Sequence, residues 1–218
     1  EERWSDAERD YRELLARGER GGAVLFNLGN VYARWTGHEA EALACYREAE
    51  RHWPNDANLA SNLDALLVRL AGAASRTPGE SRLAELFAWR RDFATGTLLD
   101  LATLALALTL LLGALRSALG ARFALGRLAL ATGILALVLG AGLLLRWSET
   151  RPGSNAVVRE PAVLRSGPGE SFEASGAALP IGSELRVSEL REAERRTWVR
   201  VGDASRSGWV PRDALVVY

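Results

Sequence analysis

The sequence contains no lysine, so all 27 of its basic residues are arginine. A phosphate-binding loop of the Walker type, Schiff-base chemistry and a Ser-Lys pair each need a lysine side chain, so these classes are excluded. The single cysteine, Cys45, can form no internal disulfide. The two histidines, His38 and His52, belong to no Cys or His cluster, so the sequence predicts neither a metal site nor a cofactor.

Methionine is also absent, including at the first position. The simplest interpretation is a mature chain whose secretory signal peptide has been removed, although a trimmed sequence would look the same.

The charges are spread unevenly along the chain. Residues 1–92 carry 13 Arg against 16 Asp and Glu, and residues 155–218 carry nine of each. Nucleic-acid binding needs a basic face, so neither part predicts it. Residues 93–154 carry five Arg but only two acidic residues, Asp100 and Glu149, in the most apolar part of the chain. Arginines at the edges of an apolar segment indicate a membrane protein.

Two apolar runs, 93–115 and 123–146, are long enough to cross a bilayer. The uncharged stretch from Leu128 to Leu145 has 18 residues. As a helix it spans roughly 27 Å, close to the roughly 30 Å of a hydrocarbon core. The connection at 116–122 is short and basic, so we expect a hairpin with both terminal parts on the same side. Arginines flank both ends of the hairpin, and charge alone therefore leaves the side open. We expect the outside, from the absent methionine and the C-terminal pattern below.

The spans contain two features of their own. Small residues recur on one face of the second span, at Ala129, Gly133, Ala136 and Gly140. They predict a close contact with another helix, either the first span or a partner. Asp100 is a functional candidate if it lies inside the membrane and an ordinary headgroup-level residue if the span begins later.

Residues 25–54 match the spacing of a tetratricopeptide repeat. The matching positions are Leu25, Leu28, Gly29, Tyr32, Ala42, Tyr46, Ala49 and Pro54. Small residues let the two helices approach each other and tyrosines fill the space between them. The turn is one residue longer than in the usual repeat of about 34 residues. Flanking half-repeats supply the neighbours that a single repeat needs, which predicts a small helical domain.

In such repeats the first helices line a concave face. Polar residues on this face are Asn27, Asn30, Arg34 and Asn62. They could hold the backbone of a partner peptide, or they could tie the helices to each other. Further along, Thr77-Pro78-Gly79-Glu80 has the form of a capping box before an amphipathic segment, which predicts a helix at the membrane surface.

From residue 155 on, short β-branched runs alternate with Gly, Pro, Ser and Asp, which predicts a small β-barrel. The order AVLRSGPG, LPIGSELRV, TWVRV and SGWVP resembles a bacterial SH3 domain. The resemblance implies a ligand groove at Arg165, Trp198 and Trp209. The alternative is that both tryptophans fill the barrel. Ala214 replaces the tyrosine of a proline-binding groove, which argues against polyproline recognition.

The sequence therefore predicts a multidomain chain: all-α tetratricopeptide-like repeats at 1–72, a linker with an amphipathic helix at 73–92, a two-helix transmembrane hairpin at 93–115 and 123–146 joined by 116–122, a linker at 147–154 and an all-β SH3-like barrel at 155–218.

This order of parts resembles the BatE-type aerotolerance proteins over essentially the whole chain. The resemblance implies a scaffold in the bacterial cytoplasmic membrane that faces the periplasm. It also implies, as partners, membrane proteins with von Willebrand factor type A domains and a MoxR-type ATPase system. No catalytic residue is implied, and we expect no enzyme activity. The alternative function is a sensor that binds peptidoglycan peptides through the SH3-like domain.

Overall fold

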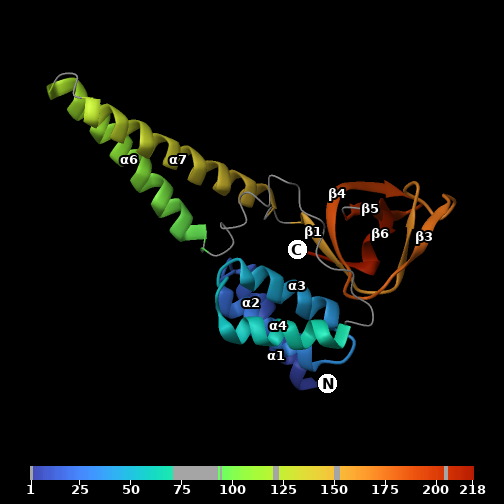
Figure 1. Ribbon diagram of the computed structural model, residues 1–218. Coiled ribbons are helices and arrows are strands. Elements are labelled where there is room, and N and C mark those ends of the chain that lie inside the picture. The colour runs from blue at the N-terminus through green and yellow to red at the C-terminus, as the bar shows by residue number, and fades with distance from the viewer. Residues whose placement is uncertain (1, 71–92, 94, 120–122, 150–152, 204–205) are drawn as a thin grey trace. The chain divides into compact units, whose positions relative to one another are not determined.

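The computed structural model describes residues 2–70, 93, 95–119, 123–149, 153–203 and 206–218 (Figure 1). The chain divides into two compact units. The first combines Glu1–Ser81 with Thr150–Tyr218, and the second is Arg82–Glu149. The predicted amphipathic helix at 73–92 lies outside the described residues.

Residues 2–70 of the first unit form four helices, α1 (Glu2–Ala16), α2 (Gly22–Arg34), α3 (Glu39–Glu50) and α4 (Ala57–Leu70). Helices α2 and α3 approach closely because Gly29 has no side chain: a Cβ there would lie 2.6 Å from the ring of Tyr46. Asp56 caps α4, since its side chain accepts a hydrogen bond of 2.8 Å from the N–H of Leu59.

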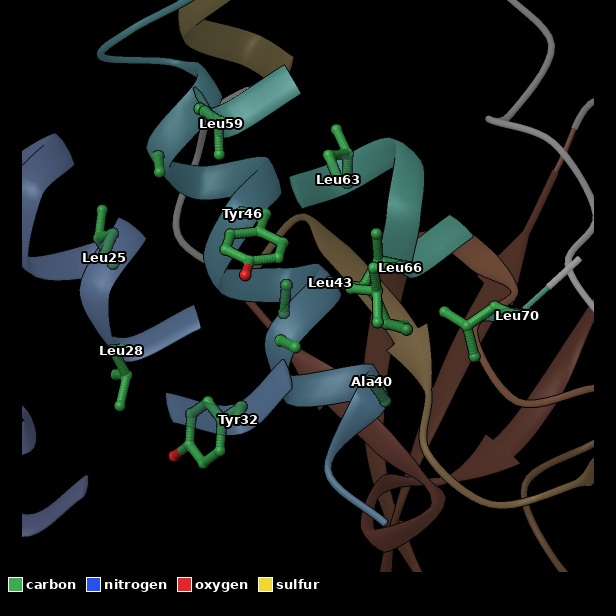
Figure 2. Close-up of a cluster of buried hydrophobic side chains, with 14 residues drawn as sticks. Leu25, Leu28, Tyr32, Ala40, Leu43, Tyr46, Leu59, Leu63, Leu66 and Leu70 are labelled. Atoms are coloured by element: carbon green, nitrogen blue, oxygen red, sulfur yellow. The ribbon is translucent and has the colours of Figure 1, made fainter. Parts of the chain in front are cut away.

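The helical core is made of leucines, alanines and tyrosines from α2, α3 and α4, together with Val157 (Figure 2). Its largest buried side chains are Leu25, Leu43, Tyr46, Leu59 and Leu66. On α4 the buried residues are Leu59, Leu63, Leu66 and Leu70, spaced by three or four, so one stripe of the helix is buried.

The C-terminal part of the first unit is one antiparallel sheet of seven strands in the order β3-β2-β6-β5-β4-β1-β7. The strands are β1 (Asn155–Val158), β2 (Ala162–Arg165), β3 (Ala174–Leu179), β4 (Glu184–Ala193), β5 (Arg196–Gly202), β6 (Ser207–Pro211) and β7 (Leu215–Val217), with a 3-10 turn, η2, at Arg212–Ala214. Glu194 and Arg195 have positive φ, of 52° and 62°, in the two-residue turn between β4 and β5. This conformation matches the twist of a tight hairpin.

Helices and sheet share buried surface. Val157 of β1 belongs to the helical core cluster, and Ile181, Val216 and Tyr218 pack against that cluster. Arg47 of α3 donates two hydrogen bonds to the carboxylate of Glu184 at the start of β4, of 2.9 and 3.0 Å. The helices and the sheet therefore form one unit joined by apolar and ionic contacts.

The predicted fold class is wrong. The sequence suggested a separate helical-repeat domain and a separate SH3-like barrel, but the structure has one small fold whose helices and seven-stranded sheet share a core. The physical reason lies in β1, where Ala156 and Val158 pack in the core of the sheet and Val157 packs against the helices. A strand buried on both faces is a continuous apolar run, so its sequence does not show what covers each face.

The described helices of the second unit are α6 (Thr95–Leu119) and α7 (Phe123–Glu149), which lie side by side (Figure 1). Leu98 and Ala105 of α6 pack with Leu139 of α7, and the hydroxyl groups of Thr109 and Thr132 are hydrogen-bonded at 3.0 Å. Gly96–Leu119 and Ala124–Leu145 are long and apolar enough to cross a membrane, and only 17% and 11% of their most apolar stretches are buried. The prediction of two apolar helices of membrane-spanning length is confirmed with respect to their length and composition.

Candidate functional site

A pocket of about 150 Å³ lies between α2 and α4. Its lining residues are Asn30, Ala33, Arg34, Tyr46, Asn62, Ala65, Leu66 and Arg69. Those from α2 and those from α4 are spaced by three or four positions, so each helix contributes one face. Tyr46 is the contribution of α3. Three consecutive helices of the described structure therefore meet at this pocket.

One oxygen atom links these three helices. Oδ1 of Asn30 accepts hydrogen bonds from the hydroxyl of Tyr46 at 2.8 Å and from Nδ2 of Asn62 at 2.7 Å. Nδ2 of Asn30 and Oδ1 of Asn62 have no hydrogen-bond partner among the described residues. The pocket thus keeps one amide donor and one amide acceptor beside a fixed bridge.

The pocket is lined by cationic and not by acidic side chains. Arg34 and Arg69 are both exposed, and neither forms an ion pair with any residue that the structure describes. Nη2 of Arg69 also donates a 2.9 Å hydrogen bond to the carbonyl of Ala33, which holds α4 against α2. Burial raises the pKa of Tyr46, while the amide of Asn62 and the charges of Arg34 and Arg69 oppose this shift.

The predicted concave-face residues are only partly brought together. Asn30, Arg34 and Asn62 line the pocket, whereas Asn27 is exposed elsewhere on α2. The bond between Asn30 and Asn62 ties two helices together, as one of the two interpretations requires. Sequence reasoning missed Arg69. The spacing of residues 62, 65, 66 and 69 could have indicated it, because these positions lie on one face of α4.

No protein-family model, curated protein or solved structure matches this chain. The resemblance to BatE-type proteins therefore stays a prediction that rests on the order of the sequence motifs.

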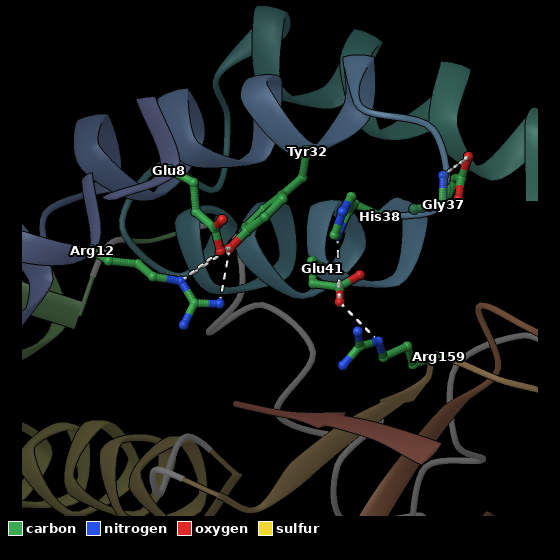
Figure 3. A network of polar contacts seen from close by, with 8 residues as sticks. Glu8, Arg12, Tyr32, Gly37, His38, Glu41 and Arg159 are labelled. Carbon is green, nitrogen blue, oxygen red and sulfur yellow. Dashed lines mark hydrogen bonds and ion pairs between the residues drawn. The ribbon is translucent and has the colours of Figure 1, made fainter. Parts of the chain in front are cut away.

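A second polar group holds α1 against α2 (Figure 3). The hydroxyl of Tyr32 donates to Oε1 of Glu8 at 2.8 Å and accepts a hydrogen bond from Arg12 at 3.1 Å. Burial raises the pKa of Tyr32. The phenol therefore stays neutral at ordinary pH, and the network is structural.

Ionisable side chains also lie close together around the start of α3. Nδ1 of His38 lies 3.8 Å from Oε1 of Glu41, and Nε of Arg159 lies 3.2 Å from the same oxygen (Figure 3). Burial raises the pKa of Cys45 to about 12, so its sulfur is a thiol and not a reactive thiolate at neutral pH. Within the described ranges no group of three or more His, Cys, Asp or Glu could hold a metal ion.

The predicted groove residues of the sheet differ in exposure. Arg165 of β2 pairs in register with Trp209 of β6, and its guanidinium donates to the carbonyls of Glu170 and Phe172 at 2.9 and 2.8 Å. Trp209 is 6% exposed and Trp198 is fully buried. Trp198 therefore offers a ligand no surface in this conformation, and its burial fits the interpretation that it fills the interior.

The predicted small-residue face of α7 is only partly occupied by α6. A Cβ on Gly133 would lie 3.5 Å from Thr109, and Ala136 packs against the α6–α7 core. Ala129 is half-buried, whereas Gly140 is exposed with nothing within 4 Å of a Cβ. Asp100 is exposed on α6, between Leu98 and Ala102, which pack against α7.

Proposed function

We propose that this chain is a membrane-anchored adaptor that holds a segment of a partner protein in the pocket between α2 and α4. The observation that carries the proposal is the pocket itself, in which amide and guanidinium groups surround a small apolar space. Such a combination suits a peptide, because apolar side chains give contact area and a few polar groups fix its orientation.

The anchor of this adaptor is the pair of apolar helices α6 and α7, whose exposed leucines favour lipid as their surroundings. In the proposed setting the first unit lies in the periplasm. The resemblance to BatE-type proteins suggests von Willebrand factor type A membrane proteins and a MoxR-type ATPase system as partners. An adaptor of this kind needs no catalytic residue and no cofactor. A cell-wall peptide bound at Arg165, Trp198 and Trp209 has less support, since Trp198 is buried.

A photo-crosslinking amino acid at Ala65 tests the proposal. Ala65 is exposed and lines the pocket, whereas Ala60 is exposed on the same helix but does not line it. In membranes of the native host, a crosslinker at Ala65 should capture a distinct protein that a crosslinker at Ala60 does not capture. Equal capture from both positions, or none from Ala65, would contradict an adaptor role for this pocket.

Co-purification gives a second measurement. Asn62→Ala changes the pocket, whereas Asn27→Ala changes an exposed asparagine outside it. The captured protein should co-purify less with the Asn62→Ala variant and at the normal level with the Asn27→Ala variant.

A further inference from the structure

Two arginines lie at the end of the second unit where α6 leads into α7. The last turn of α6 and the first turns of α7, residues 116–119 and 123–127, form what we call the hairpin tip (Figure 1). Arg116 is in the last turn of α6 and Arg127 is in the second turn of α7. Both residues are exposed, and neither forms an ion pair or a hydrogen bond with any residue that the structure describes.

The acidic residues of α6 and α7 lie too far along the helices to neutralise this pair. They are Asp100 and Glu149. Asp100 comes 16 positions before Arg116, which is roughly 24 Å along α6 at about 1.5 Å per residue. Glu149 comes 22 positions after Arg127, roughly 33 Å along α7. The hairpin tip therefore carries two positive charges that no carboxylate of its own two helices can reach.

The guanidinium group of Arg116 lies against the other helix. A Cβ on Gly126 of α7 would lie 2.9 Å from Nη1 and 3.2 Å from Cζ of Arg116. The missing side chain at Gly126 thus leaves the space that this guanidinium group occupies. Arg127 is the next residue of α7, so one cation from each helix lies at nearly the same level of the hairpin tip.

The length of the uncharged part of α6 indicates the depth of Arg116 in a bilayer. Between Asp100 and Arg116 there are 15 uncharged residues, roughly 23 Å of helix, whereas a hydrocarbon core is roughly 30 Å thick. If α6 crosses the bilayer, its two charges cannot both lie outside the hydrocarbon without thinning it. A long arginine side chain in this position extends toward the surface, where the lipid phosphates are.

A lipid phosphate also matches the chemistry of the hairpin tip. A guanidinium group donates two parallel hydrogen bonds to the oxygens of a phosphate. Basic positions between membrane helices bind anionic head groups for this reason. In a bilayer the phosphates of lipids are concentrated at the level of the arginines, whereas free phosphate in solution is not.

We propose that Arg116 and Arg127 bind the phosphate group of an anionic phospholipid at the hairpin tip, with Gly126 providing the space for the guanidinium group of Arg116. This proposal rests on the membrane anchor of the proposed function and specifies the class of lipid that the anchor binds.

Native mass spectrometry of the full chain in detergent micelles tests this proposal. The probes are phosphatidylglycerol, which is anionic, and phosphatidylcholine with the same acyl chains, whose choline group balances the phosphate. The first phosphatidylglycerol molecule should bind about tenfold more tightly than the first phosphatidylcholine molecule.

Variants locate the bound lipid. Arg116→Gln and Arg127→Gln should each reduce the affinity for phosphatidylglycerol about fivefold and leave the affinity for phosphatidylcholine unchanged. Gly126→Ala keeps both charges but places a methyl group where the guanidinium group of Arg116 lies, so it should also weaken phosphatidylglycerol binding. The matched control is Gly113→Ala near the end of α6, because a Cβ there meets nothing within 4 Å. Far-ultraviolet circular dichroism should show the same helix content in all variants.

Three results would overturn the lipid assignment. The first is equal affinity for the two lipids. The second is a loss of affinity in the arginine variants but none in Gly126→Ala, which would indicate attraction by net charge instead of a site. The third is displacement of bound phosphatidylglycerol by inorganic phosphate at millimolar concentration, which would assign the arginines to a free phosphate.

Flotation of the full chain with phosphatidylcholine vesicles tests the membrane anchor separately. A chain that floats but binds the two lipids equally would keep its anchor and lose only the lipid site. A chain that does not float would contradict both. The crosslink from Ala65 depends on neither result and continues to test the adaptor pocket.

Discussion

Arg47 and Glu184 are 137 positions apart in the sequence, and they form a two-bonded ion pair of 2.9 and 3.0 Å between α3 and β4. The side chains are 20% and 9% exposed, so the pair is largely shielded from water. Burial opposes the charge of Arg47, but the hydrogen bonds and charges of Glu184 and Glu50 outweigh it, and the pKa of Arg47 is raised. Removing Arg47 takes the ion-pair partner away from the largely buried Glu184, whereas removing Glu184 leaves Arg47 with Glu50 at 3.1 Å.

Arg47→Met should therefore lower the free energy of unfolding of the first unit by about 3 kcal/mol, because it leaves Glu184 unpaired. Arg47→Met combined with Glu184→Leu should recover most of this loss, since no buried charge remains. Urea denaturation of the full chain in detergent, followed by near-ultraviolet circular dichroism, measures both. The control is Arg17→Gln, which removes an exposed pair with Glu13 and should change stability by less than about 1 kcal/mol. If the free-energy changes of the two single variants simply add up in the double variant, the two residues are not directly coupled.

Gly29→Ala should destabilise the helical part by about 1 to 3 kcal/mol through overpacking. The new methyl group would lie 2.6 Å from the ring of Tyr46, which is itself held by its bond to Asn30. Gly21→Ala is the comparison, because a Cβ there meets nothing within 4 Å and the change removes only the preference of an N-cap for glycine over alanine. Thermal unfolding should show a lower midpoint for Gly29→Ala than for Gly21→Ala. A midpoint equal to that of the unsubstituted protein would mean that α2 and α3 can separate at little cost.

Cys45 should make stability fall at alkaline pH. Its pKa is raised from 9.0 to about 12 by burial, so the folded chain keeps a proton that the unfolded chain releases. The contribution of this thiol to stability is complete below about pH 9 and decreases from there to about pH 12, by roughly 1.4 kcal/mol per pH unit at most. The urea midpoint should decrease between about pH 8 and about pH 10, and this decrease should be smaller in Cys45→Ala than in the unsubstituted chain. Equal falls would show that the thiol ionises as readily in the folded chain.

Protease treatment of intact spheroplasts tests the proposed orientation. Both terminal parts of the chain should be digested before lysis if they lie in the periplasm. The control is a cytoplasmic marker protein, which should resist digestion until the cells are lysed. Protection of both terminal parts before lysis would reverse the orientation and direct the search for partners to the cytoplasm.

The local structure was largely predictable, and the contacts between distant segments were not. The spacing of Gly29 and Tyr46 indicated the close approach of two helices, because a period of three to four residues is visible within one short stretch. The apolar run at Leu128 to Leu145 indicated a helix for the same reason. The pairing of Arg47 with Glu184 produces no pattern in the sequence, since each residue alone looks like an ordinary surface charge.

The candidate pocket was half predictable. Asn30, Arg34 and Asn62 were identified because they lie on the first helix of each repeat-like segment. Whether their amides face a ligand or each other depends on the distance between α2 and α4, which the sequence does not encode locally. Arg69 was missed because α4 has no complete repeat around it to compare with.

The first unit is assembled from two stretches of chain separated by residues 82–149. Its helices are synthesised first, yet Val157 and Glu184, which cover part of α3, follow only after both apolar helices have left the ribosome. Until then Arg47 has Glu50 of the same helix as an ion-pair partner but lacks Glu184. If both helices cross the bilayer, the two stretches can meet only because the number of crossings is even, so the loss of either span would prevent the unit from forming.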